Sequence, residues 1–140
     1  KLLMGTGKAM QKELAGLIRF RSCRHPNLLP ILHIDKVDNR LYYTVPPADN
    51  LTPGEGYSAD TLAHRLSIQG PLPASEVMAI TVELLAGLKE LHRHKLMPRD
   101  IKPDNILWLN RQAVLADVGL VRNHADAGAC GSPGFMPEDV

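Results

Sequence analysis

The first third of the chain opens with a helical pattern of apolar and polar residues. Between Lys8 and about Cys23, apolar residues recur near the spacing of one helix face, with charged residues among them. This pattern predicts one amphipathic helix. Pro26, in the segment RHPN at 24–27, should end it, because proline lacks a backbone donor and disfavours the helical conformation at the residue before it.

Two short apolar runs follow this helix. They are LLPILHI at 28–34 and LYYTV at 41–45. Asp38 and Asn39 lie between them and favour a tight turn, so the two runs predict an antiparallel hairpin. Residues 46–60 are rich in Pro, Gly, Asp and Asn and show no periodicity, which predicts a connector. Regular structure should resume at about Thr61.

The longest periodic segment runs from about Ala74 to His94. Its apolar residues form one stripe, which predicts a helix with a buried face: Val77, Ile80, Leu84, Leu88 and Leu91. After a charged loop, NILWL at 105–109 and AVLAD at 113–117 flank the turn NRQ, which predicts two short strands. A glycine-rich tail follows.

Composition excludes several function classes. The 140 residues carry 16 Lys and Arg against 15 Asp and Glu, and a net charge of +1 gives no reason to expect a nucleic-acid or acidic-membrane surface. No apolar run approaches the roughly 20 residues that would cross a bilayer, so the segment is expected to be soluble and to make no membrane contact. Cys23 and Cys130 are too few and too far apart for a disulfide framework, which favours a reducing, cytoplasmic location.

The stretch LMPRDIKPDNIL at 96–107 concentrates fixed charge beside apolar residues. Buried charges must be paired or hydrogen-bonded, so such a loop gains little stability and usually serves a site. Asp100, Asn105 and Asp117 offer the oxygen ligands that Mg²⁺ prefers. Lys102 could balance the phosphate charge that accompanies such a metal. These residues therefore indicate phosphoryl transfer, although a salt-bridged structural turn is the alternative.

In their order along the chain, the blocks PRDIKPDN, DVG and GSPGF resemble the catalytic loop, metal-binding loop and activation segment of the eukaryotic-type serine/threonine protein kinase family. HPNLLPIL and PLPASEVMAITVELLAGLKELH resemble further parts of the same domain. The resemblance implies an α+β, protein-kinase-like fold. Residues 1–47 would belong to a partial small lobe, 48–60 to the hinge and connector, and 61–140 to a partial large lobe. The chain would be an internal fragment, inactive in isolation.

The resemblance also implies the roles of the site residues. Asp100 would accept the proton of the substrate hydroxyl, and Lys102 would lie beside the transferred phosphoryl group. Arg99 would tie the loop to the activation segment, and Ser132 would orient the base. Asn105 and Asp117 would hold Mg²⁺, and the order KPDN favours protein Ser or Thr substrates.

ATP would be the second ligand implied by the family. Its pocket would be formed by Lys1, Glu13, Val45, Pro46, Ala48 and Leu107. Lys1 would pair with Glu13, although a solvated lysine is an equal alternative. Proline lacks an N–H group but keeps its carbonyl, so Pro46 could still accept a hydrogen bond from adenine while Ala48 donates one.

Some departures from the family pattern keep a second function open. Pro98 and Val118 replace a His and a Phe of a buried column that Leu17 and Ile31 would complete, which favours a looser switch between states. A pseudokinase that binds partners without transfer is therefore the alternative. A small-molecule kinase of the aminoglycoside type fits less well, because that group resembles HGDxxxxN. The sequence leaves the oligomeric state open.

Overall fold

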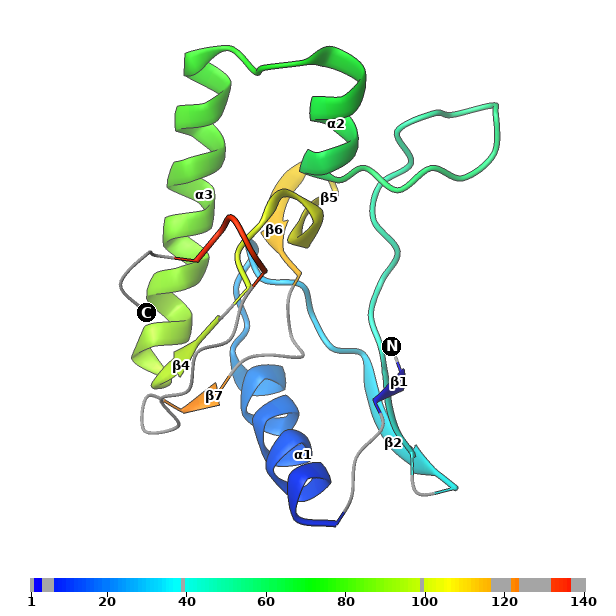
Figure 1. The fold of residues 1–140 in the computed structure, drawn as a ribbon, viewed down its shortest axis with the longest axis vertical. Helices are drawn as coiled ribbons and strands as arrows, with labels where there is room; N and C mark the ends of the chain where they lie inside the picture. Colours follow the sequence, from blue (N-terminus) through cyan, green and yellow to red (C-terminus); the bar gives the residue numbers. More distant parts are fainter. Residues whose placement is uncertain are drawn as a thin grey trace.

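The structure, a computed structural model, describes residues 2–3, 7–38, 40–98, 100–116, 122–123 and 132–136. Its helices and small antiparallel sheets confirm the predicted α+β class. Helix α1 (Gly7–Ser22) and a three-stranded sheet lie at one end, and α2 (Leu62–Gln69) with the start of α3 (Ala74–Arg93) lies at the other (Figure 1). None of the described helices is long and apolar enough to cross a membrane.

The three-stranded sheet contains the predicted hairpin. Its order is β1 (Leu2–Leu3), β3 (Arg40–Thr44) and β2 (His33–Val37), and neighbouring strands are antiparallel. Asp38 has the positive φ of 47° that suits a tight turn. The expected start of the first strand is wrong, because β2 begins at His33 and not at Leu28.

The segment before β2 pairs with a different strand. Leu29 N donates to Leu115 O at 3.0 Å, and Leu115 N donates to Asn27 O at 3.0 Å. The buried Asn27 side chain adds a bond from Nδ2 to Ala113 O at 2.9 Å. Pro30 follows and has no N–H to give to a hairpin partner. The segment 27–29 is therefore fastened to β6 (Gln112–Leu115), and the sheet strand can start only after it.

Helix α3 and the strand pair β5 (Ile106–Leu109) and β6 have the predicted bounds within a few residues. Between the strands, Asn110 and Arg111 both have positive φ values, of 52° and 66°. Their N–H groups donate to the two carboxylate oxygens of Asp49 at 2.9 and 2.8 Å. The connector thus stabilises the turn that closes the strand pair. Two further short strands, β4 (Leu96–Met97) and β7 (Arg122–Asn123), pair antiparallel.

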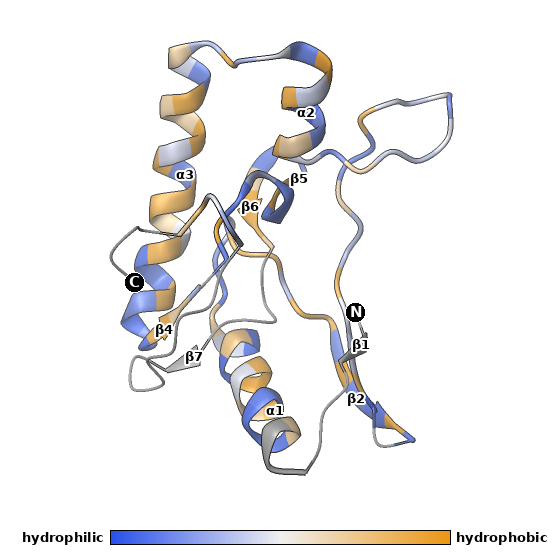
Figure 2. Cartoon of the chain, in the orientation of Figure 1, coloured by the Kyte–Doolittle hydropathy of each residue, from blue (hydrophilic) through white to orange (hydrophobic). Residues whose placement is uncertain are grey.

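The core has two parts. The larger one joins α1, the 28–31 segment, β3, α3 and β6 through buried apolar side chains that include Leu17, Phe20, Ile31, Leu41, Leu91 and Leu115. The smaller one joins α3 to the strand pair, through Ile80, Ile106, Trp108 and Ala113. The strands β5 and β6 and parts of α3 are correspondingly apolar in Figure 2.

The predicted stripe of α3 is buried from Ile80 onward, but not at its start. Ile80 and Leu91 are buried and Leu84 and Leu88 are half-buried, whereas Val77 is 46% exposed. The assignment of Val77 to the core is therefore wrong. Ile80 belongs to the smaller core cluster and Leu91 to the larger one, and neither cluster includes Val77.

Helix α2 follows the connector, where the sequence predicted only the return of regular structure. Thr61 caps it: its side chain accepts a hydrogen bond from His64 N at 3.1 Å. Within the connector, Asn50 Oδ1 accepts from Ser58 N at 2.8 Å, and Asn50 Nδ2 donates to Gly56 O at 3.0 Å. The connector has no helix or longer strand among residues 46–60, as predicted.

Helix α3 approaches the 27–29 segment at Gly87. A Cβ atom at this position would lie 2.8 Å from the backbone oxygen of Asn27 and 3.2 Å from a methyl carbon of Leu28. Backbone atoms cannot move aside as the end of a flexible side chain can. A residue without a side chain is therefore required where α3 crosses this segment.

We predict that Gly87→Ala destabilises the protein. Helix propensity alone would make it more stable by about 1 kcal/mol, whereas overpacking costs about 1–3 kcal/mol, so the sign of the change identifies the dominant effect. Urea unfolding measures it. Thr81→Ala, at an exposed position of the same helix, is the control and should change stability by less than about 0.5 kcal/mol. A more stable Gly87→Ala variant would contradict the close contact.

Candidate active site

The charged loop lies between β4 and β5 and ends in a single turn of 3₁₀ helix, Pro103–Asn105. Asn105 N donates to Lys102 O at 2.9 Å, which closes this turn. Pro103 stands at the first helical position, where its fixed φ is favourable and no N–H is needed. The next residue, Ile106, is buried under α3, so the loop is anchored directly beside its polar side chains.

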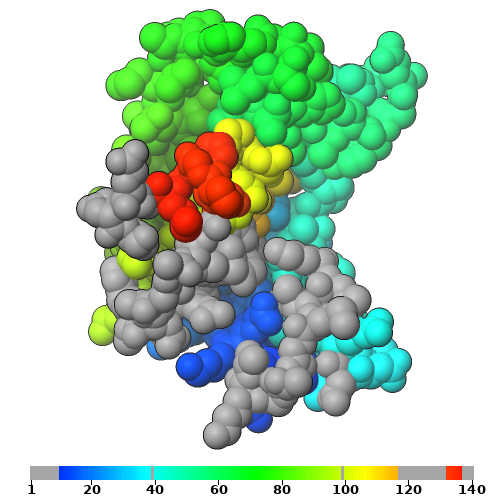
Figure 3. All heavy atoms as spheres, viewed as in Figure 1, coloured from blue at the N-terminus to red at the C-terminus, as the bar shows by residue number. Residues whose placement is uncertain are grey.

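Four of the predicted residues meet around one carboxylate. Lys102 Nζ lies 2.9 Å from Asp100 Oδ2 and donates to Ser132 Oγ at 2.7 Å. Asn105 Nδ2 donates to Asp100 O at 2.7 Å and lies 3.3 Å from Asp100 Oδ2. Residues 132–136, shown in red in Figure 3, lie against this loop, shown in yellow. The structure thus brings Asp100, Lys102, Asn105 and Ser132 together.

The Asp100 carboxylate is held in its ionised form. Interaction with the Ser132 side chain and then with Lys102 lowers the pKa of Asp100, and burial opposes this effect only in part. The Ser132 hydroxyl accepts a hydrogen bond from Lys102, and Ser132 also lies close enough to Asp100 to favour the charged carboxylate. Asp100 is therefore charged at neutral pH although only 9% of its surface is exposed.

One oxygen of this carboxylate has no donor. Asp100 Oδ1 is buried, and within the described part of the chain no group hydrogen-bonds to it. An unpaired buried acceptor of this kind costs about 1–3 kcal/mol. Such a cost is typical of a site that receives its donor from a ligand.

Asn105 is oriented so that its amide oxygen can serve as a ligand. Its Nδ2 is engaged with Asp100, and none of the described residues donates to its Oδ1. The backbone O of Asn105 accepts from Ala116 N at 2.8 Å, which holds the end of β6 beside the loop. An amide oxygen fits the oxygen-rich coordination of Mg²⁺. Asp117, the predicted partner ligand, lies outside the described residues, as does Arg99.

The connector start offers the expected pattern of donors and acceptors. Val45, Pro46 and Ala48 are half-buried. Ala48 O accepts from the Tyr57 hydroxyl at 3.1 Å, whereas no hydrogen bond with a described residue involves Ala48 N or Pro46 O. One acceptor and one donor, two residues apart, are thus left for a ligand.

The remaining predicted positions are described only in part. Leu107 is half-buried on β5, opposite Val114. Leu17 and Ile31 pack in the same buried cluster, as the column requires, whereas Pro98 is half-buried and Val118 lies outside the described residues. Glu13 is half-buried on α1. Lys1 is also outside the described residues, so its pairing with Glu13 stays a prediction.

Comparison with known proteins decides the family. Residues 5–140 match the family model of the protein kinase domain. The chain belongs to the protein kinase family. It is 33% identical over 124 residues to serine/threonine-protein kinase PknA of Nostoc, a match that covers 79% of this chain and 21% of that protein. It is 32% identical over 117 residues to serine/threonine-protein kinase 36 of Pongo abelii, covering 80% and 8%.

A third relative gives the same result. The carbon catabolite-derepressing protein kinase of Candida albicans is 28% identical over 133 residues, which cover 91% of this chain and 19% of that protein. The chain therefore spans a small part of the length of each of these kinases.

The kinase chain also contains a supporting network that the sequence did not reveal. Arg65 binds Asp60 through Nε at 2.7 Å and through a terminal nitrogen at 2.8 Å, and it approaches Glu76 at 3.4 Å. Its guanidinium lies 3.5 Å from the ring centroid of Trp108, a cation–π contact. This network fixes α2 on β5, the strand that carries Leu107. Trp108 is distant from the other three members in the sequence, and no spacing signals their contact.

The pKa of Asp100 leads to a prediction on stability. A carboxyl whose pKa is lowered by folding adds stability above its unfolded pKa, and that stability is lost as the pH falls through the folded pKa. Ser132→Ala removes the largest cause of the lowering. The unfolding free energy of Ser132→Ala should therefore lie below that of the wild type at neutral pH. This difference should become smaller below about pH 4, near the ordinary pKa of Asp.

Urea unfolding at a series of pH values measures this difference. Ser67→Ala, at an exposed position of α2, is the matched control and should show no such pH dependence. If Ser132→Ala lowered the unfolding free energy by the same amount at every pH, Ser132 would not stabilise the charged form of Asp100.

Proposed function

We propose that this chain is part of a serine/threonine protein kinase catalytic domain, which transfers the γ-phosphate of ATP to a Ser or Thr hydroxyl of a protein. The observation that carries the proposal is the buried, ionised Asp100 with one oxygen left without a donor beside Lys102 and Asn105. Residues 1–47 would form part of the small lobe, 48–60 the hinge and connector, and 61–140 part of the large lobe.

Asp100 Oδ1 would accept the proton of the substrate hydroxyl. As the hydroxyl oxygen forms its bond to the γ-phosphorus, the bond from that phosphorus to the leaving ADP oxygen breaks, and Asp100 takes the proton. Asp100 Oδ2 is already bound by Lys102, so the carboxylate has a fixed orientation when the hydroxyl arrives. This arrangement supplies positioning rather than covalent chemistry.

Lys102 would stabilise the negative charge of the transferred group. Its ammonium is held between Asp100 and Ser132, within reach of a phosphoryl group that Asp100 faces. Ser132 would thus be a positioning residue for both side chains. Arg99 would connect this loop to the activation segment.

Asn105 and Asp117 would hold Mg²⁺ through their side-chain oxygens. The ion, when bound with ATP, neutralises phosphate charge and orients the γ-phosphate. Asn105 is suited to this role because its amide nitrogen is already engaged with Asp100, which turns the oxygen away from that carboxylate.

Adenine would bind to the connector start beside Val45. Pro46 O would accept from the adenine amino group, and Ala48 N would donate to a ring nitrogen. Leu107 would form an apolar surface under the ring, and Lys1, paired with Glu13, would contact the phosphates. The hydroxyl of Tyr57 already donates to Ala48 O, whereas Ala48 N has no partner among the described residues.

A pseudokinase remains the second candidate function, and Pro98 is the observation that favours it. This residue, two positions before Asp100 and half-buried, stands where the family has a histidine of the buried column. A transfer assay distinguishes the two functions.

We predict that Asp100→Asn in the full-length protein lowers kcat at least about 100-fold, because general-base catalysis contributes about 10²–10⁴-fold. Transfer of labelled phosphate to a generic basic protein measures the rate. Asp104→Asn is the matched control, since Asp104 lies exposed in the same loop and should retain activity. Equal rates for wild type and Asp100→Asn would end the catalytic assignment and favour the pseudokinase.

The hinge gives a separate prediction. Ala48→Pro removes the N–H proposed to bind adenine, and the loss of one hydrogen bond of about 0.5–1.5 kcal/mol should raise KM for ATP several-fold to about tenfold. Pro47→Ala, next to it, should leave KM unchanged. ATP titration of the initial rate tests this, with thermal melting as the check that both variants fold. An unchanged KM in folded Ala48→Pro would exclude this donor.

A further inference from the structure

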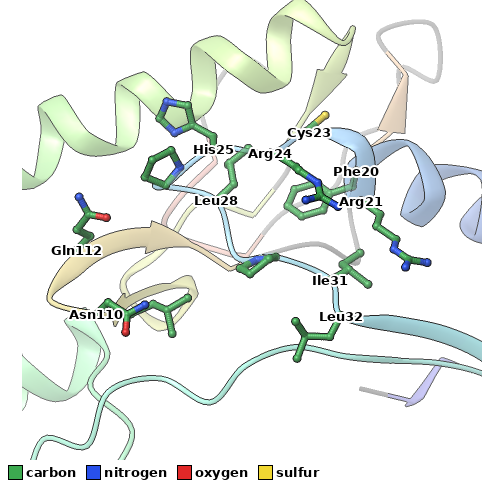
Figure 4. Close-up of a pocket in the computed structure, with 13 residues that line it drawn as sticks. Phe20, Arg21, Cys23, Arg24, His25, Leu28, Ile31, Leu32, Asn110 and Gln112 are labelled. Carbon is green, nitrogen blue, oxygen red and sulfur yellow. The ribbon is translucent and has the colours of Figure 1, made fainter.

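A groove of about 610 Å³ lies on a face that the proposed reaction does not use. It is lined by the end of α1, the 23–32 segment and the turn between β5 and β6 (Figure 4). The lining includes none of the proposed catalytic, metal-binding or ATP-binding residues. The groove therefore needs an explanation of its own.

The floor of the groove is apolar and is held rigidly. Phe20, Leu28 and Ile31 line it and belong to the buried core. Leu32 lines the same groove and is 56% exposed, so its apolar side chain faces solvent beside this buried floor. The backbone bonds from the 27–29 segment to β6 hold this floor in place, which lowers the entropic cost of binding there.

The charged side chains that line the groove have one sign, although Glu90, outside the lining, acts on the lining residue Cys23. Arg21 and Arg24 line it and are exposed, and His25 lines it as well, whereas no Asp or Glu is among the lining residues. His25 Nδ1 accepts a hydrogen bond from Asn27 N at 3.1 Å, so Nε2 is the ring's remaining donor. The overall chain is nearly neutral, with a net charge of +1, so this concentration of donors and cations is local.

We propose that this groove docks a short acidic peptide segment of a partner protein, with one large apolar side chain seated on the floor and carboxylates facing Arg21 and Arg24. Charge complementarity selects the occupant, because a basic or neutral apolar segment would leave two cations unpaired at the interface. The volume suits the side chains of a few residues. The proposal does not depend on phosphoryl transfer.

The test uses the full-length protein and a fluorescent peptide with a central Phe flanked by glutamates, followed by fluorescence anisotropy. We expect saturable binding that weakens as salt is added. Arg21→Glu combined with Arg24→Glu should weaken it about tenfold or more, since two rim pairs become repulsive. Leu32→Ser should weaken it several-fold. Arg40→Glu, an exposed arginine on β3 outside the groove, is the matched control and should bind as the wild type does.

Peptide controls separate charge from shape. A peptide with Ala in place of the central Phe should bind several-fold more weakly, and one with lysines in place of the glutamates should not bind. Absence of saturable binding to the wild type would overturn the proposal. So would equal weakening by the groove double variant and by Arg40→Glu, or equal affinity for the Phe and Ala peptides, because the groove would then play no part.

Discussion

The pairing of the 27–29 segment with β6 is the interaction on which the rest of the structure depends. Three hydrogen bonds, two through the backbone and one through the buried Asn27 side chain, fasten the loop after α1 to the strand pair under α3. Around them pack the side chains of the larger core cluster. Buried polar groups are costly when unpaired, so this junction tolerates little displacement. It joins the part of the chain that carries α1 and the sheet to the part that carries the charged loop between β4 and β5.

The same junction positions the candidate active site. Ala116, the residue after β6, donates its N–H to the backbone oxygen of Asn105, and β5 starts at the buried Ile106 directly after the loop. These two contacts fix the backbone of the loop, and so they fix the positions of its charged side chains. Lys102 contacts both Asp100 Oδ2 and Ser132 Oγ, and Asp100 Oδ1 has no hydrogen-bond donor among the described residues. A rigid frame with one unsatisfied acceptor is what a proton transfer at a defined atom requires.

Periodicity predicted the elements whose stability comes from one apolar face. It gave both long helices and the strands β5 and β6, since local spacing decides which side chains share a face. It failed at residues 28–32, which are as apolar as a strand, because Leu29 N bonds Leu115 O of β6 and Pro30 has no N–H to give. It failed at Val77 as well, because spacing does not show how far along a helix its apolar face is covered.

The site was predictable for a different reason. The contact between Lys102 and Ser132 spans 30 positions, and only the resemblance to kinase motifs linked them before the structure did. No sequence pattern predicted the groove. Its lining comes from separate segments, and Arg21 and Arg24 are typical of a solvent-exposed helix end. The Arg65 network was hidden in the same way.

The crossing of α3 over the 27–29 segment at Gly87 also limits how the protein can move. Because the Asn27 carbonyl lies against a residue that has no side chain, we expect the 27–29 segment and α3 to move together. Any swing of α1 toward or away from the catalytic loop must then pivot on the few residues between Ser22 and Asn27. The torsions of this short stretch would set both the range and the direction of that swing.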